Sequence, residues 1–252
     1  MITLMRRFFI LMTVFVLIPG CAYVNPLVED FNIISIPQER TLGEQSAAEV
    51  AKQMTIVTDP ALTSRVRKIG SRLVAALPDR QFDYAFSVVQ DNTPNAFTIP
   101  GGKIYVHTGL LKFAGDDDEL AGVIAHEVGH AYDRHPAKGM SRAYGVDYLS
   151  KLIFKGSQSQ LKTLALQFAA GGLLSHYSRD EELRADSIGY QLAVKAGYRT
   201  DGLIRFFKKL MTLESKGTSI PFLASHPPTP ERIARLQAMS QQGIAVPQNT
   251  FR

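Results

Sequence analysis

The stretch His126-Glu127-Val128-Gly129-His130 limits what this chain can fold into more than any other feature of its sequence. Two histidines four residues apart lie on one face of an α-helix, about one turn apart, so both imidazoles can reach the same ion. The glutamate after the first histidine stands on the adjacent flank, where it can hold a metal-bound water and take its proton. Gly129 has no side chain and lets another element approach the helix closely. The stretch therefore predicts a helix that carries a catalytic metal site.

A third ligand is expected elsewhere in the chain, because a catalytic zinc ion takes three protein ligands and leaves a fourth position for water. The acidic, helical pattern of residues 178–186 offers candidates. Glu182 and Asp186 are four residues apart and share a helix face. Glu182 can therefore bind the metal, while Asp186 accepts the free ring N–H of a ligand histidine. Glu181 is the alternative ligand, and the acids could instead form a solvated face that pairs with neighbouring arginines.

The N-terminus has the parts of an export signal, which covers residues 1–20. Arg6 and Arg7 form a positive segment, and residues 8–18 form an apolar run of about eleven residues. Such a run is too short to span a bilayer comfortably and is typical of a signal peptide. Pro19, Gly20 and Cys21 come after this run, and Cys21 is the only cysteine of the chain. An intramolecular disulfide is therefore excluded.

The small residue before Cys21 resembles the lipobox of bacterial lipoproteins, in which the signal is cut before the cysteine and lipid chains are attached to it. Ile18 and Pro19 are less usual at their places in that pattern. The alternatives are an ordinary signal peptide or an uncleaved anchor. Several acyl chains give stable anchoring, and by analogy with lipoproteins Ala22 favours the outer membrane. We therefore expect a lipid-anchored protein that faces the periplasm.

The sequence divides into four segments. They are the signal peptide at 1–20, a membrane tether at 21–39, a catalytic domain at 40–240 and a C-terminal tail at 241–252. The formal net charge of +5 falls to +3 without the signal, because its two arginines are its only charged residues. This charge is mild, and no basic run with interleaved aromatics occurs, so the sequence argues against a nucleic-acid partner.

Hydrophobic periodicity and turn signals predict a mixture of helices and short strands. Helices are predicted at 41–57, 60–77, 118–134, 179–196, 200–215 and 231–239, with a mostly helical region at 141–175, and strands at 82–89, 95–99 and 103–107. Thr41 is expected to open the first helix with a capping box. Pro100 follows the middle strand, which is therefore expected at a sheet edge. Asn95, Ala96 and Phe97 could then pair with an extended substrate; the alternative is an ordinary hairpin.

Five motifs occur in order between about residues 40 and 240. They are Asn95-Ala96-Phe97-Thr98-Ile99-Pro100-Gly101-Gly102, Asp118-Glu119-Leu120-Ala121, His126-Glu127-Val128-Gly129-His130, Ser178-Arg179 with Glu182 and Ala185-Asp186, and Ser225-His226-Pro227 with Glu231-Arg232-Ile233. Together they resemble peptidase family M48, whose members include membrane-bound CAAX proteases, heat-shock-related HtpX proteases and periplasmic lipoprotein proteases. The chain looks like the compact lipoprotein branch.

This resemblance implies one zinc ion per chain, held by His126, His130 and Glu182, with Glu127 as the catalytic base. It also implies that His226, in a loop rich in Gly, Ser and Pro, approaches the metal. His226 would be either a fourth ligand in a resting state, which acts as a latch, or a donor to the oxyanion. The alternative is a loop histidine that caps a helix.

The other three histidines lack partner spacing. His107 is expected on a strand, and His135 and His176 are expected to be surface or packing residues.

The resemblance implies an α+β fold of the zincin-like (gluzincin) kind, mostly helical, with a small antiparallel sheet and an edge strand beside the helix of the two histidines. It implies a zinc-dependent endopeptidase of the bacterial envelope that degrades misfolded or misassembled envelope proteins. Two other functions stay open. One is a non-enzymatic, metal-stabilised chaperone or assembly factor for outer-membrane proteins, which would have no use for Glu127 as a base. The other is a zinc hydrolase of cell-wall peptides. Nothing in the sequence indicates an oligomeric state.

Overall fold

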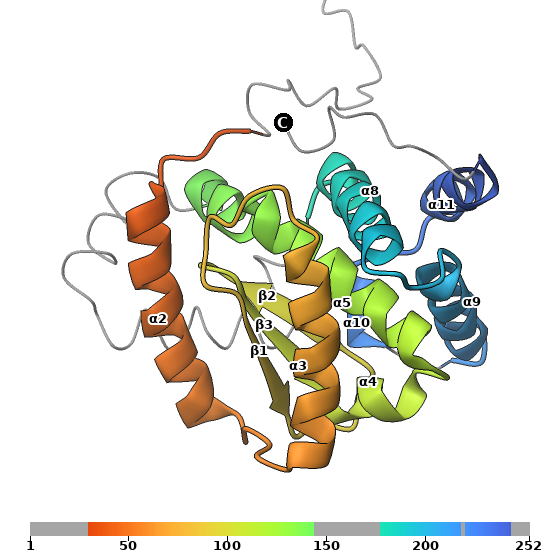
Figure 1. The fold of residues 1–252 in the computed structure, drawn as a ribbon, viewed down its shortest axis with the longest axis horizontal. Coiled ribbons are helices and arrows are strands. Elements are labelled where there is room, and N and C mark those ends of the chain that lie inside the picture. Colours follow the sequence, from red (N-terminus) through yellow and green to blue (C-terminus); the bar gives the residue numbers. More distant parts are fainter. Residues whose placement is uncertain (1–29, 144–176, 218–219, 243–252) are drawn as a thin grey trace, which may run out of the picture.

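The computed structural model describes residues 30–143, 177–217 and 220–242, in which helices surround a small sheet (Figure 1). The helices are α2 (Ile36–Gln53), α3 (Pro60–Ala75), α4 (Thr108–Phe113), α5 (Asp117–Tyr132), α8 (Arg179–Lys195), α9 (Gly202–Glu214), α10 (Pro221–Ser225) and α11 (Pro230–Gln242). Residues 135–143 are also helical. The mostly helical α+β fold is therefore confirmed. The predicted signal, Cys21, His176 and most of the helical region predicted at 141–175 lie outside the described residues.

Helix α2 begins five residues earlier than predicted. Ser35 is its N-cap and forms a capping box with Gln38: the Ser35 hydroxyl accepts from the Gln38 N–H, and the Gln38 side chain accepts from the Ser35 N–H. Pro37 stands in the first turn, where its missing N–H costs nothing. The prediction that Thr41 caps the helix was wrong, because its hydroxyl bonds back to the Pro37 carbonyl inside the helix. Ile34 is already buried, within the segment predicted as a tether.

The sheet is mixed rather than antiparallel. Its strands are β1 (Ala85–Val89), β2 (Ala96–Ile99) and β3 (Lys103–His107), in the order β1-β3-β2. β2 and β3 form the predicted antiparallel hairpin, with β2 at the edge. β1 pairs with β3 in parallel, so the antiparallel prediction was wrong for this pair. The reason is that residues 90–95 carry the chain to the far edge, and β3 then returns through the turn at 100–102 into the central position.

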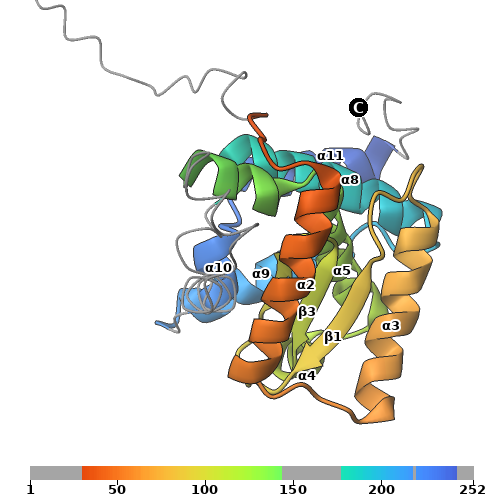
Figure 2. The same cartoon turned by 90° about the vertical axis from the view of Figure 1, so that its left-hand side faces the viewer.

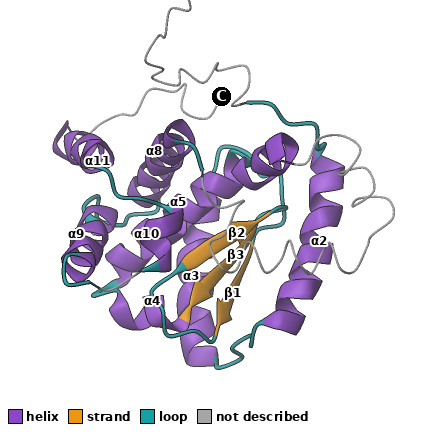
Figure 3. Ribbon diagram, turned by 180° about the vertical axis from the view of Figure 1, so that it is seen from behind, coloured by secondary structure: helices purple, strands orange, loops and turns teal. Residues whose placement is uncertain are grey.

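The two faces of the sheet contribute to two core clusters. Val88 and Ile104 share one cluster with Leu73 of α3 and with the apolar residues of α5. Phe97 and Tyr105, whose rings stack at 5.0 Å, belong to the other cluster together with residues of α2. Figure 2 shows the sheet between α2 and α3. In Figure 3, α8, α9 and α11 lie on the side of α5 away from α2. Helix α5 is therefore covered on all sides, as its burial requires.

Close packing of α5 on α8 positions the site. A Cβ on Gly129 of α5 would lie 2.7 Å from the Ala185 carbonyl oxygen, and a Cβ on Gly189 of α8 would lie 2.8 Å from the backbone nitrogen of His126. Both distances are below 3.0 Å, which Cβ atoms essentially never show, so glycine at both positions permits this approach of the two backbones. The predicted role of Gly129 agrees with this packing. None of the helices in the described ranges is both long enough and apolar enough to cross a bilayer.

Candidate metal centre

Helix α5 carries the central residues of the site. Asp116 caps it by accepting the N–H of Glu119 at 2.9 Å, and the first turn holds further acidic residues that the helix dipole favours. Every residue from Glu119 to Tyr132 is buried. His126 and His130 are both fully buried, so their ring nitrogens need partners within the protein.

Four side chains from distant parts of the chain converge at this point. Glu182 of α8 and His226, which follows α10, join His126 and His130, and one ligand atom from each lies within 4.8 Å of the others. The Nε2 atoms of His126 and His130 are 3.0 Å apart, and each is 3.4 Å from an oxygen of Glu182. His226 Nδ1 lies 2.9 Å from Glu182 Oε1 and 3.3 Å from His126 Nε2. The alternative ligand, Glu181, instead forms the capping box of α8.

Asp186 and Arg232 support the cluster from behind. Asp186 Oδ1 lies 2.9 Å from His126 Nδ1, the ring nitrogen that faces away from the cluster. Arg232 is 1% exposed and donates to both oxygens of Asp186, at 2.7 and 2.8 Å. It also reaches Glu182 Oε2 at 2.6 Å and the Pro227 carbonyl at 3.0 Å. One buried guanidinium therefore joins two acids of α8 to the loop that carries His226.

Glu127 points to the edge strand as well as to the cluster. The hydroxyl of Thr98 on β2 donates to Glu127 Oε2 at 2.7 Å. The other oxygen, Oε1, lies 3.5 Å from His226 Nε2 and accepts no hydrogen bond from any described residue. A buried carboxylate oxygen without a donor is costly unless a water or another ligand satisfies it. The site thus leaves one acceptor ready for such a molecule.

Two of the three proposed ligands have pKa values that leave them in the forms that bind metals. Burial alone would lower the pKa of His126, but hydrogen bonds and charge interactions with Asp186 and Glu182 raise it to about 9. Burial would likewise raise the pKa of Glu182, yet the charges of His226 and Arg232 hold it well below its usual range. Burial holds the pKa of His130 well below its usual value. Without a metal, Glu182 is therefore ionised and His130 neutral, the forms in which these groups bind metals, whereas His126 carries a proton that a bound cation would displace.

Two residues at the site were not predicted from the sequence. His135 was expected to be a surface or packing residue, but it is fully buried and its Nδ1 lies 2.8 Å from Nδ1 of His130. Tyr177 stacks on the ring of His130 with the centroids 3.9 Å apart. Burial and the charge of Glu127 raise the Tyr177 pKa well above its usual value, so the phenol keeps its proton. The sequence feature that could have pointed to a role for His135 is its position just after the end of α5, five residues from His130.

The predicted substrate-binding residues lie on and next to β2. Asn95, Ala96 and Phe97 are all buried, and the Asn95 side chain accepts the Ala96 N–H at 3.0 Å. The Phe97 ring stacks on Tyr105, on the face of β2 opposite to Thr98, so Phe97 can present only backbone groups toward Glu127. His107 ends β3 as predicted; it is buried beside Thr93 and does not touch the cluster.

Comparison with known sequences places this arrangement in a family. Residues 58–240 match the sequence profile of peptidase family M48. The chain belongs to this family. It therefore carries a metallopeptidase domain, and the matched range includes every residue of the cluster.

Several curated proteins are similar over most of this chain. The beta-barrel assembly-enhancing protease of Escherichia coli (strain K12) is 25% identical over 219 residues, which are 83% of this chain and 45% of that protein. Metalloprotease YcaL of the same organism is 28% identical, over 88% of this chain and 91% of YcaL. A mitochondrial metalloendopeptidase of Schizosaccharomyces pombe is 29% identical, over 82% of this chain and 62% of that protein. The chain spans about half the length of the beta-barrel assembly-enhancing proteases it matches.

Proposed function

We propose that this chain is a zinc-dependent endopeptidase of the bacterial envelope that degrades misfolded or misassembled envelope proteins. The observation that carries this proposal is the buried cluster of His126, His130 and Glu182 beside the carboxylate of Glu127. A purely structural metal site is closed by its ligands and has no task for a further buried acid with a free oxygen. A catalytic site needs such a group as its base.

His126, His130 and Glu182 would hold the ion, because two imidazole nitrogens and a carboxylate oxygen form a common ligand set of catalytic zinc. A bound zinc ion supplies Lewis acidity, which polarises a carbonyl and lowers the pKa of a water toward neutrality. The carboxylate of Asp186, 2.9 Å from His126 Nδ1, favours a hydrogen on that outer nitrogen and thereby keeps the lone pair of the ring directed into the cluster.

Glu127 acts as the general base and then as the general acid. Thr98 engages Oε2, so Oε1 is the oxygen that takes a proton from the attacking water. The same oxygen passes the proton to the leaving amine when the peptide bond breaks. Glu127 is fully buried, so its carboxylate is shielded from bulk water.

His226 stands where it can serve in either of two ways. Its Nδ1 lies among the proposed ligands, so it can occupy the fourth position in a resting state and must then move before a substrate binds. Alternatively it donates to the oxyanion of the tetrahedral intermediate. Tyr177, which keeps its proton beside His130, is a second candidate donor.

The substrate class is proposed from the edge strand and from the relatives. β2 has a strand neighbour on one side only among the described residues, and its Thr98 touches Glu127. An extended segment that adds to this edge would pass the catalytic carboxylate. Unfolded chains offer such segments. Relatives named beta-barrel assembly-enhancing proteases support envelope proteins as the source of these chains.

Lipid attachment at Cys21 would hold the enzyme on the periplasmic side of the outer membrane. The proposal predicts that the wild-type protein incorporates labelled fatty acid and that Cys21→Ser does not. A wild-type protein that takes up no label would argue for an ordinary signal peptide or an uncleaved anchor instead.

The deciding experiment compares the purified domain with its Glu127→Gln variant. Both should bind one zinc ion, whereas the variant should cleave an unfolded outer-membrane protein at least about a hundredfold more slowly, the usual contribution of a general base. Wild-type protein treated with a chelator is the second control. If Glu127→Gln still prevents aggregation of the unfolded protein and rescues deletion cells, the chaperone function is correct. Release of cell-wall peptides without protein cleavage would favour the cell-wall hydrolase.

A further inference from the structure

His135 forms a hydrogen-bonded link between a proposed metal ligand and an acid. Its Nδ1 lies 2.8 Å from His130 Nδ1, and its Nε2 lies 2.7 Å from Asp133 Oδ2. The side chain is fully buried. Arg134, with a φ of 59°, turns the chain sharply after α5, so that His135 comes back beside the helix that it has just left. Arg134 is held in this conformation by Glu39 of α2 at 2.7 Å.

The donor and acceptor roles along this link follow from its outer end. An ionised carboxylate only accepts hydrogen bonds, so His135 Nε2 must carry the hydrogen that faces Asp133. A neutral His135 then has a lone pair on Nδ1, and the hydrogen between the two rings must belong to His130 Nδ1. The lone pair of His130 is therefore on Nε2, the atom that faces the metal cluster.

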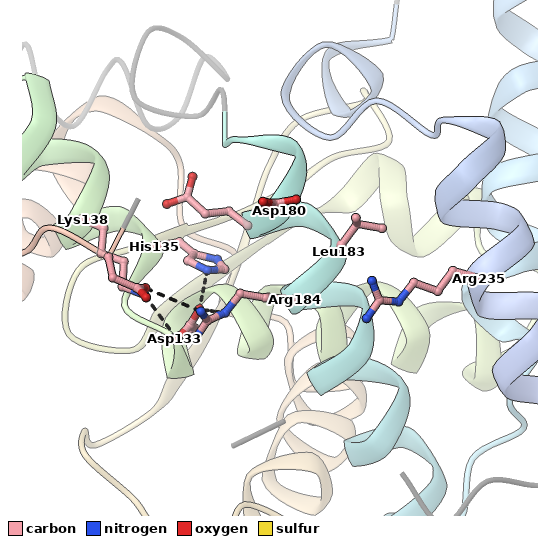
Figure 4. A pocket seen from close by; sticks show the side chains of 9 residues that line it. Asp133, His135, Lys138, Asp180, Leu183, Arg184 and Arg235 are labelled. Atoms are coloured by element: carbon pink, nitrogen blue, oxygen red, sulfur yellow. Dashed lines mark hydrogen bonds and ion pairs between the residues drawn. The ribbon is translucent and has the colours of Figure 1, made fainter. Parts of the chain in front are cut away.

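Asp133 is fixed in place by two cations. Arg184 Nε lies 2.7 Å from Oδ2, and Lys138 Nζ lies 3.3 Å from Oδ1. Figure 4 shows Asp133, His135 and Arg184 in the wall of a pocket. The pocket has a volume of about 310 Å³, and none of the four cluster residues lines it. The Asp133 carboxylate is thus the outer end of the link. It lines a pocket, pairs with Arg184 and Lys138, and contacts His135 Nε2.

The two proposed histidine ligands have parallel supports. His126 meets Asp186 directly, and Arg232 holds that acid. His130 is also supported by an acid that cations hold, namely Asp133. Here, however, the imidazole of His135 lies between the proposed ligand and the acid. The outer nitrogen of His130 therefore reaches a carboxylate through one intervening imidazole, whereas that of His126 lies directly beside one.

We propose that His135 is a positioning residue that fixes the tautomer and ring orientation of His130, with Asp133 as the final acceptor. The proposal rests on His130 being a metal ligand, as the proposed function states. Loss of the link leaves His130 free to rotate or to place a hydrogen on Nε2, and both changes weaken metal binding. Removal of such supporting partners typically costs roughly 10–100-fold in metal affinity.

Zinc affinity of three variants tests the proposal. His135→Leu fills a similar volume but accepts no hydrogen bond, whereas His135→Asn places an amide oxygen where Nδ1 was. His107→Leu is the matched control, because His107 is also buried but does not touch the cluster. Competition with a chromophoric chelator should show affinity reduced roughly 10–100-fold in His135→Leu, largely restored in His135→Asn and unchanged in His107→Leu.

A second measurement needs no variant and therefore holds even if His135→Leu does not fold. In the zinc-loaded wild-type protein, nitrogen-15 NMR should show His135 with a hydrogen on Nε2 and none on Nδ1. A hydrogen on Nδ1 of His135, or wild-type affinity in a folded His135→Leu variant, would overturn the proposal and leave the proposed function standing. A wild-type domain that binds no zinc would overturn both.

Discussion

The Thr98 hydroxyl donates a hydrogen bond of 2.7 Å to Oε2 of Glu127, which joins the edge strand of the sheet to the helix of the metal cluster. Both side chains are buried, and the bond leaves Glu127 Oε1 without a described donor. Thr98 thus determines which oxygen of the proposed base is free. The same hydroxyl lies 3.1 Å from the Glu127 carbonyl oxygen, so Thr98 couples the strand expected to bind substrate to the base expected to act on it.

Replacing Thr98 should therefore reduce catalysis and leave metal binding intact. Thr98→Val has nearly the same shape but cannot donate, and hydrogen bonds to charged groups contribute about 1.5–3 kcal/mol. We expect kcat/KM on a quenched fluorescent peptide to fall tenfold or more, with one zinc ion still bound. Thr98→Ser should keep most of the activity. A parallel loss of zinc and activity in Thr98→Val would indicate misfolding rather than a misplaced base.

Arg232 should be essential to the metal-free domain. It is the buried partner of both Asp186 and Glu182, and removing one member of a buried ion pair costs about 3–5 kcal/mol. Arg232→Met should lower the free energy of unfolding by about that amount, measured by urea unfolding with a chelator present. Arg232→Lys cannot reproduce the bidentate contact and should be destabilised too. Stability within about 0.5 kcal/mol of wild type would contradict this role.

The contact between α5 and α8 should tolerate no side chain at Gly129. A Cβ there would press on the backbone of Ala185, one turn from the proposed ligand Glu182, so the helices must separate. Gly129→Ala should lower both the melting temperature and the zinc affinity. Gly115→Ala is the control, since its Cβ would meet its nearest atom at an ordinary 3.4 Å. Equal behaviour of the two variants would show that α8 can shift without disturbing the ligands.

Asp116 should make the stability of the domain dependent on pH. It caps α5, and a hydrogen bond from Arg205 lowers its pKa from 3.8 to about 2. Since the folded pKa is the lower one, the stabilisation is complete above about pH 4 and is lost as the pH falls toward 2. In urea unfolding of metal-free protein, Asp116→Ala should cost about 1 kcal/mol at pH 7, and the difference should narrow below pH 4. A difference independent of pH would show that the contribution of Asp116 does not depend on its charge.

Predictions from local pattern succeeded where neighbouring residues set the structure. Helix α5 formed as expected because its cap, its acidic first turn and its apolar residues are contiguous. The start of α2 was misplaced because Thr41 with Glu44 and Ser35 with Gln38 both fit a capping pattern, and the buried Ile34 favours the earlier one. The parallel pairing of β1 with β3 could not be predicted, since it depends on the path of the connection between strands.

The sequence alone determined that this chain has a helix with His126 and His130 on one face, because four-residue spacing on a helix has one geometric outcome. It also placed Glu182 and Asp186 on a second helix. Only the tertiary structure decided that Thr98 meets Glu127, that Arg232 joins the two acids, and that His135 supports His130. The Thr98 contact joins residues 29 positions apart and the contact of Arg232 with Glu182 joins residues 50 positions apart. The packing of separate helices and strands therefore decides them. The His135 contact is short in sequence but depends on a left-handed turn at Arg134, a conformation seldom adopted by residues other than glycine.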